Sequence, residues 1–152
     1  MLAHLLKLVH VLAVILWVGG MAFVLGFLRP AVATLEPAAR VRLMHEVLRR
    51  FLQAVLAAVV LVLASGLAMM ALAAGQAADG WRMPASWSTM AALGLAMAAI
   101  FGHIRMAPYR RLERAVAGAD WPSAGAALAS IRRWVLVNLG LGVLTVAVVL
   151  LG

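Results

Sequence analysis

The 152-residue chain contains no cysteine, which excludes disulfide bonds, thiolate metal sites and cysteine nucleophiles. Acidic residues are also scarce, with five Asp and Glu against 13 Lys and Arg. All five acids fall between the long apolar segments or at their ends, so no pair of carboxylates lies within an apolar segment. No His-Glu-x-x-His and no glycine-rich phosphate loop occurs either. Hydrolytic chemistry and ion-driven transport through a buried acid are therefore not expected.

Apolar residues make up 66% of the chain, and the mean hydropathy is +1.07. A soluble domain is roughly 45–50% apolar, and a chain of this size cannot hide so large an excess from water. Four segments are long and apolar enough to cross a bilayer as helices. They are residues 2–28, 51–74, 86–106 and 134–151. We expect an all-α integral membrane four-helix bundle that forms one transmembrane domain over residues 1–152.

Prolines and capping residues mark the ends of these helices. Pro30 is expected to close the first span, because the residue before a proline avoids the α region. Pro108 is expected to end or kink the third span. Helices should restart at Pro37 and at Asp120-Trp121-Pro122-Ser123, and should run on into the second and fourth spans.

The basic residues are unevenly distributed, and this predicts an orientation. Of the 13 Lys and Arg, 11 lie in the first and third linkers or at the helix ends beside them. By the positive-inside rule these linkers face the cytoplasm, and both termini face the periplasm of a bacterial inner membrane. The rule also explains the net charge of +8. We therefore expect the lipid bilayer, and no nucleic acid, as a partner.

His10 is the sharpest candidate for chemistry, because an ionisable residue within a span is costly. It lies on a helical stripe of mostly small or aromatic residues, which leaves room for close helix packing or for a flat cofactor. The stripe consists of Ala3, Leu6, His10, Ala13, Trp17, Gly20 and Met21. The alternative is a neutral histidine that is hydrogen-bonded to a neighbouring helix.

The depth of His10 selects its candidate partners. At 1.5 Å per residue, we expect Met69, Met70 and Met90 at a similar height. An imidazole and a thioether form a known axial pair for haem iron, and the same soft pair suits Cu(I). The alternative is that each methionine fills space in the core or faces lipid.

Two further histidines complete the candidate set. His103 is expected about 16 Å in height from His10, on a stripe of small residues (Ala92, Ala96 and Ala99). It is either a cofactor ligand or part of a structural polar layer. His4 lies near the periplasmic surface, where it is either solvated or part of a copper-entry path with His10 and a methionine.

Several different short motifs follow one another along nearly the whole chain. They are residues 5–10 (Leu-Leu-Lys-Leu-Val-His), 17–20 (Trp-Val-Gly-Gly), 28–30 (Leu-Arg-Pro), 44–51, 65–66, 101–103 (Phe-Gly-His), 108–112, 118–121, 132–134 and 138–139. This set resembles the CopD-type copper-resistance membrane domains and the HemJ-type protoporphyrinogen oxidases. The resemblance implies a four-span bundle, often a homodimer, whose first-span histidine is the key ligand. That role falls on His10 and, more loosely, on His103.

The resemblance leaves haem and copper both open. HemJ-type proteins are associated with b-type haem and porphyrinogen oxidation, and CopD-type proteins with copper passage or tolerance. A lysine expected early in the third span of HemJ-like proteins is missing from residues 86–95, where Met90 stands instead. This departure argues against porphyrinogen oxidation.

Four hypotheses follow. The first is an inner-membrane b-type haem protein that transfers electrons to an unknown redox partner, with His10 as an axial ligand. The second is a CopD-like membrane protein that transports or tolerates copper, binding Cu(I) through His and Met. The third is a HemJ-like oxidoreductase, and the fourth is an assembly subunit without a cofactor. The sequence slightly favours haem, because the nine methionines are scattered.

Overall fold

The computed structural model of the protein describes residues 1–76 and 82–151, and within these ranges it is helical and contains no strand. Seven α-helices and two π-helical segments follow one another along the chain. They are α1 (Leu2–Val14), η1 (Ile15–Gly19), α2 (Gly20–Phe23), η2 (Val24–Leu28), α3 (Arg29–Val32), α4 (Pro37–Gln76), α5 (Ala85–Met106), α6 (Pro108–Ala117) and α7 (Trp121–Leu151).

These elements form four units that are long and apolar enough to cross a membrane. They are Leu2–Val32, Pro37–Gln76, Ala85–Ala117 and Trp121–Leu151. Each of the four predicted spans lies inside one of these units, so the predicted all-α four-helix membrane bundle is confirmed. The helices extend beyond the predicted spans because their polar ends continue the same backbone hydrogen bonding outside the apolar stretch.

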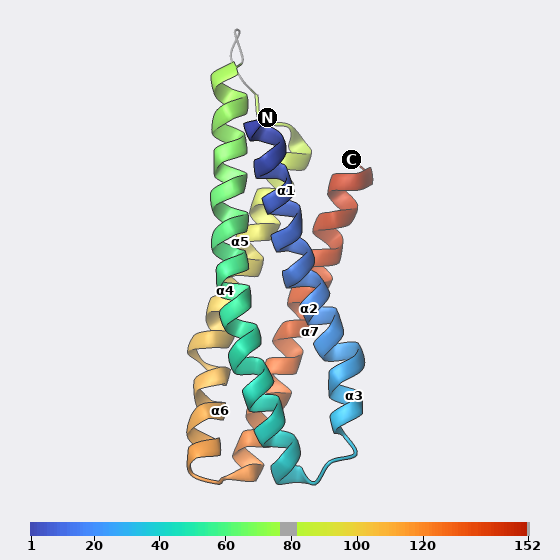
Figure 1. The fold of residues 1–152 in the computed structure, drawn as a ribbon, viewed down its shortest axis with the longest axis vertical. Coiled ribbons are helices and arrows are strands. Elements are labelled where there is room, and N and C mark those ends of the chain that lie inside the picture. Colours follow the sequence, from blue (N-terminus) through green and yellow to red (C-terminus); the bar gives the residue numbers. More distant parts are fainter. Residues whose placement is uncertain (77–81, 152) are drawn as a thin grey trace.

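The bundle is built from two helix pairs. The first helix packs along α4, and α5 and α6 pack along α7. Figure 1 shows that α1 begins and α7 ends toward the same end of the molecule. We call this the terminal end. The opposite end carries the 33–36 turn and the α6–α7 turn. We call it the basic end because 11 of the 13 Lys and Arg lie in the linkers and helix ends beside it.

The predicted end of the first span at Pro30 is wrong, because the helix continues through Pro30 to Val32. The reason lies in the preceding segment, η2, where the hydrogen-bond ladder has already widened: the N–H of Arg29 donates to the carbonyl of Val24. Proline breaks an α-helix by removing one donor and crowding an upstream carbonyl. A π-helical turn relieves both effects locally.

The other predicted boundaries are confirmed. α5 ends at Met106 and α6 begins at Pro108, so this proline breaks the third unit as expected. Before α7, the Asp120 side chain accepts a hydrogen bond from the backbone N–H of Ser123 at 3.1 Å. This is the geometry of an N-cap, in which a carboxylate satisfies a donor that the helix itself leaves free.

The interior is apolar and closely packed. Trp17 is 3% exposed and meets the Phe101 ring edge-on, with 6.5 Å between ring centroids. Near the same level, a methyl group added at Gly142 would lie 2.9 Å from Val18 and 3.2 Å from Met97. α7 therefore approaches the first helix and α5 closely at this glycine.

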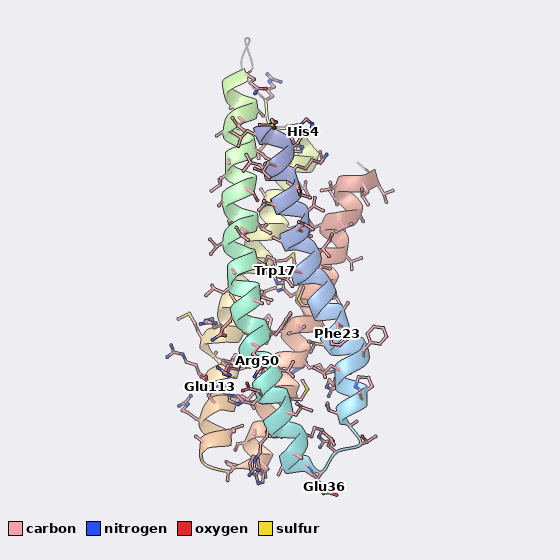
Figure 2. The ribbon with its side chains drawn as sticks, viewed as in Figure 1. His4, Trp17, Phe23, Glu36, Arg50 and Glu113 are labelled. Atoms are coloured by element: carbon pink, nitrogen blue, oxygen red, sulfur yellow. The ribbon has the colours of Figure 1, made fainter. Side chains whose placement is uncertain are left out.

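The outer surface is apolar as well. Large hydrophobic side chains such as Phe23, Phe27, Leu67 and Val143 are more than half exposed. A surface of this kind is stable against lipid and not against water. Together with the four long apolar helices, it identifies a multi-pass membrane protein. Figure 2 shows His4 at the terminal end, Trp17 midway along the bundle, and Arg50, Glu113 and Glu36 toward the basic end.

Candidate metal-binding site around His10

His10 lies in the interface between α1 and α4, as its helical stripe predicted. Its ring nitrogen Nδ1 is 2.9 Å from the hydroxyl oxygen of Ser65 on α4. Ser65 is one of two polar residues buried in the described part of the chain, at 4% exposed. The alternative expected for His10, a hydrogen bond to a neighbouring helix, is therefore observed. This bond does not exclude a ligand role, because it occupies only one of the two ring nitrogens.

The hydrogen bonds of Ser65 favour one position for the proton on the His10 ring. The Ser65 hydroxyl has a single proton, and its oxygen lies within hydrogen-bond distance of two backbone carbonyls of its own helix, those of Leu61 and Val62. Carbonyls only accept, so they compete for the hydroxyl proton, and we assign it to one of them. The hydroxyl oxygen then accepts a hydrogen bond from Nδ1–H of His10. In this tautomer Nε2 holds the lone pair.

A histidine fixed in this way is chemically suited to bind a soft metal ion. Metal-binding histidines usually donate their second ring N–H to an oxygen, which fixes the tautomer and orients the ring. Ser65 supplies that oxygen from α4, while Nε2 of His10 stays available as the ligand atom. The pair has the arrangement of a ligand and its positioning residue, contributed by the two helices of one interface.

The two helices are close together at this point. A methyl group added at Gly66 would lie 3.4 Å from Cε1 and 3.8 Å from Nδ1 of the His10 ring. The imidazole therefore rests almost directly on the α4 backbone. A flat macrocycle such as haem needs its own thickness plus van der Waals contact on both faces. On the Gly66 side of the His10 ring there is therefore no room for a haem between α1 and α4.

The predicted methionine partners occupy different positions relative to His10. Met69 and Met70 follow Ser65 and Gly66 by four residues on α4, so they share the same face. They also lie about 6 Å nearer the terminal end. Their predicted height, level with His10, is therefore off by one helical turn. The difference arises from the register between α1 and α4, which sets Ser65 level with His10.

Met90 does lie close to the height of His10. Val18, Met97 and Gly142 share one level, because an added methyl group at Gly142 would touch the other two. From that level His10 is eight residues and Met90 seven residues nearer the terminal end. These separations correspond to about 12 Å and about 10 Å. Met90 is half-buried on α5, a helix that packs chiefly on α7.

His4 and His103, the two other candidate histidines, are exposed. His4 is six residues from His10, which places it about 120° away around the helix and off the buried face, in agreement with its exposure. His103 meets the Trp134 ring edge-on at 4.8 Å, and the small-residue stripe beside it (Ala92, Ala96 and Ala99) is also exposed. This stripe therefore faces the surroundings of the chain and not its core, in contrast to the stripe of His10, on which Trp17 is buried.

The structure also draws attention to residues that the sequence did not single out as ligands. Met21, Met44 and Met97 are buried at 2%, 6% and 4% exposed, whereas the three predicted methionines are only half-buried. Met21 could have been found from its place on the His10 stripe. In an apolar helix, however, nothing in the pattern distinguishes a thioether that faces the core from one that faces lipid.

Three buried side-chain polar atoms of the described residues have no hydrogen-bond partner. They are Nε2 of His45, the hydroxyl oxygen of Tyr109 and the side-chain oxygen of Asn138. Among the residues that the structure describes, no group of three His, Asp or Glu is placed to hold a metal ion. The described His, Asp and Glu residues therefore do not by themselves complete a metal site at His10.

Comparison with known proteins identifies a family. The model of the copper resistance protein D family matches residues 45–151, more than half of the chain. The match includes Ser65, Met69, Met70, Met90 and His103, and it begins after His10. Searches of curated proteins and of solved structures gave no match.

Proposed function

We propose that this multi-pass membrane protein, which belongs to the copper resistance protein D family, binds Cu(I) as cargo within its helix bundle. His10 supplies the imidazole ligand through Nε2, and methionine thioethers supply the remaining ligands. The family match supports a role in copper resistance, which was the second hypothesis from the sequence. It gives no support to the b-type haem hypothesis, to a redox partner or to porphyrinogen oxidation.

The observation that carries this proposal is the hydrogen bond between His10 and Ser65. It orients the imidazole in an apolar interface and, in the tautomer with the proton on Nδ1, leaves the unshared electron pair at Nε2. Cu(I) prefers soft ligands, and thioether sulfur and neutral imidazole both suit it. Neither ligand carries a charge, so this site can bind a monovalent cation without a buried carboxylate.

Methionines extend the site in both directions along the membrane normal. Met69 and Met70 lie one turn beyond Ser65 toward the terminal end, on the same face of α4. Met97 and Met21 are buried on the opposite side of His10, toward the basic end. We infer a route on which Cu(I) enters near the terminal end, is held at His10, and passes between thioethers.

The direction of this route follows from the charge distribution. The basic end is proposed to face the cytoplasm, because Lys and Arg collect on that side of a bacterial inner membrane. Both termini and His4 then face the periplasm, where copper would arrive. His4 is exposed near this end and would meet the ion first.

A second copy of the chain is a further part of the proposal. His103 and its stripe of small residues are exposed on α5, where a second bundle can approach closely. A homodimer would bring two His10 sites into one assembly. Its formation is testable by cross-linking in native membranes, independently of any metal.

The experiment that tests the function is metal analysis combined with an absorption spectrum of the purified protein. Protein from cells supplied with both copper and haem precursors should contain copper and lack a Soret band. After anaerobic loading it should hold Cu(I) in a fixed ratio to protein, and the His10→Ala variant should lose most of it. A Soret band with sharp reduced α and β bands, abolished in the same variant, would overturn the copper assignment and establish haem.

A further inference from the structure

A cavity of about 360 Å³ opens at the basic end of the bundle, far from His10. Its walls come from the end of the first helix (η2 and α3), from the start of α4 and from the first half of α7. Figure 1 shows α3 standing apart from α4 and α7 at this end. A volume of this size lies in the range of small-molecule binding sites.

Three arginines from three different helices line this cavity. They are Arg29 on α3, Arg40 on α4 and Arg132 on α7. Arg29 lies close enough to the other two to be repelled by both. The salt bridges within the described residues join Glu46 to Arg49 and Arg50, and none involves these three arginines. The cluster is therefore a concentration of positive charge that forms no ion pair with a carboxylate of the described residues.

The remaining wall of the cavity is apolar. Val24, Leu48, Phe51 and Val135 line it, and they extend from the arginines toward the middle of the bundle. The site thus combines a cationic mouth with a hydrophobic interior. A small soluble anion would use only the mouth, whereas an amphiphile would use both.

The depth of the arginines matches the headgroup region of a bilayer. Residues 8–28 contain no Asp, Glu, Lys or Arg, and 21 helical residues span about 30 Å, the thickness of the hydrocarbon core. Arg29 follows directly after this run. The cluster therefore lies where lipid phosphates lie in the leaflet at the basic end.

We propose that this cavity binds an acidic phospholipid, with its phosphate held by Arg29, Arg40 and Arg132 and an acyl chain along the apolar wall. Guanidinium groups bind phosphate through paired, charge-assisted hydrogen bonds. Basic pockets between transmembrane helices on the cytoplasmic side are known to accept anionic headgroups. Free phosphate shares the headgroup chemistry, but it leaves the apolar wall uncovered.

The test is lipid binding to the purified full-length protein, measured by native mass spectrometry in a neutral detergent. Phosphatidylglycerol should bind at least about tenfold more tightly than phosphatidylcholine of the same chain length. Arg132→Gln should weaken phosphatidylglycerol binding about tenfold, as expected when a charge-assisted hydrogen bond is lost. Arg133→Gln is the matched control, because Arg133 is the adjacent residue on α7, is exposed and does not line the cavity.

Arg29→Gln provides a second variant in case Arg132→Gln does not fold, and the comparison of the two lipids in the wild-type protein needs no variant. Equal binding of the two lipids would overturn the proposal. The proposal would also be overturned if Arg132→Gln and Arg133→Gln bound phosphatidylglycerol equally, or if millimolar inorganic phosphate displaced the lipid. Cu(I) loading should be unchanged in Arg132→Gln, so the lipid site can fail without affecting the proposed function.

Discussion

Replacing Ser65 by alanine tests how the buried histidine is prepared for its ligand. The change removes the hydroxyl oxygen that lies 2.9 Å from Nδ1 of His10 and leaves the imidazole itself in place. The helix loses little, because Ser65 bonds back to carbonyls that α4 already satisfies. The Nδ1–H donor, however, is left without its partner in an apolar interface.

The expected magnitude follows from that loss. A buried donor without a partner costs about 1–3 kcal/mol, and loss of a partner behind a metal-binding histidine typically weakens metal affinity by about 10–100-fold. Both estimates point to Cu(I) binding that is weaker by at least about tenfold in Ser65→Ala. The fixed tautomer is the cause, since without Ser65 the proton on the ring is free to move to Nε2 and block the ligand atom.

The assay is anaerobic competition for Cu(I) between the detergent-purified protein and a coloured Cu(I) chelator. Ser88→Ala is the matched control, because the Ser88 hydroxyl also bonds to a carbonyl of its own helix, that of Ala85 at 2.9 Å, but is exposed. Affinity of Ser65→Ala within twofold of the wild type would refute the reasoning. An equal decrease in both variants would also refute it, by showing a general effect of removing a helical hydroxyl.

Three further predictions concern packing, pH and orientation. Gly142→Ala should lower the free energy of unfolding of the detergent-purified protein by about 1 kcal/mol or more through overpacking. Gly140→Ala should not, because its added methyl group meets open space. Equal melting temperatures for the two variants would contradict the close packing at Gly142. The hydrogen bonds from Ser123 hold the pKa of Asp120 below its usual range, so this carboxylate stabilises α7 above the ordinary aspartate pKa and the effect is lost as pH falls through its lowered pKa. The Asp120→Ala variant should therefore melt at a lower temperature than the wild type at neutral pH and at the same temperature in strong acid. A difference in melting temperature that is equal at every pH would argue against the cap. Because the chain has no cysteine, a single Glu36→Cys should react with a membrane-impermeant maleimide only after cells are opened, and labelling of intact spheroplasts would reverse the proposed orientation.

The sequence predicted the elements of this fold well, because strong local signals mark them. Long apolar runs predicted the four spans, Pro108 predicted the break between α5 and α6, and Asp120 predicted the cap of α7. Pro30 misled because a proline usually ends a helix, and the π-helical turn that accommodates it has no recognisable sequence pattern. His10 was placed on the correct buried face because its stripe contains several small and aromatic residues that lipid-facing positions do not require.

The candidate site was less predictable. The partner of His10, Ser65, is one hydroxyl within an otherwise apolar helix, and only the register between α1 and α4 brings the two together. The stripe of His103 showed the same small residues as a buried interface, yet it is exposed. In a membrane helix, apolar residues cover both the core and the lipid face, so periodicity does not determine which stripe points inward. The cavity arginines come from three separate helices, and no motif connects them.

The measurement that tests the central claim most directly is X-ray absorption at the copper edge of the Cu(I)-loaded protein, compared with its His10→Ala variant. We predict one imidazole ligand together with sulfur ligands in the wild type, because methionine is the only sulfur donor in this chain, and loss of the imidazole signal in the variant. Identical spectra for the two proteins, or a copper site without sulfur, would contradict a cargo site built on His10.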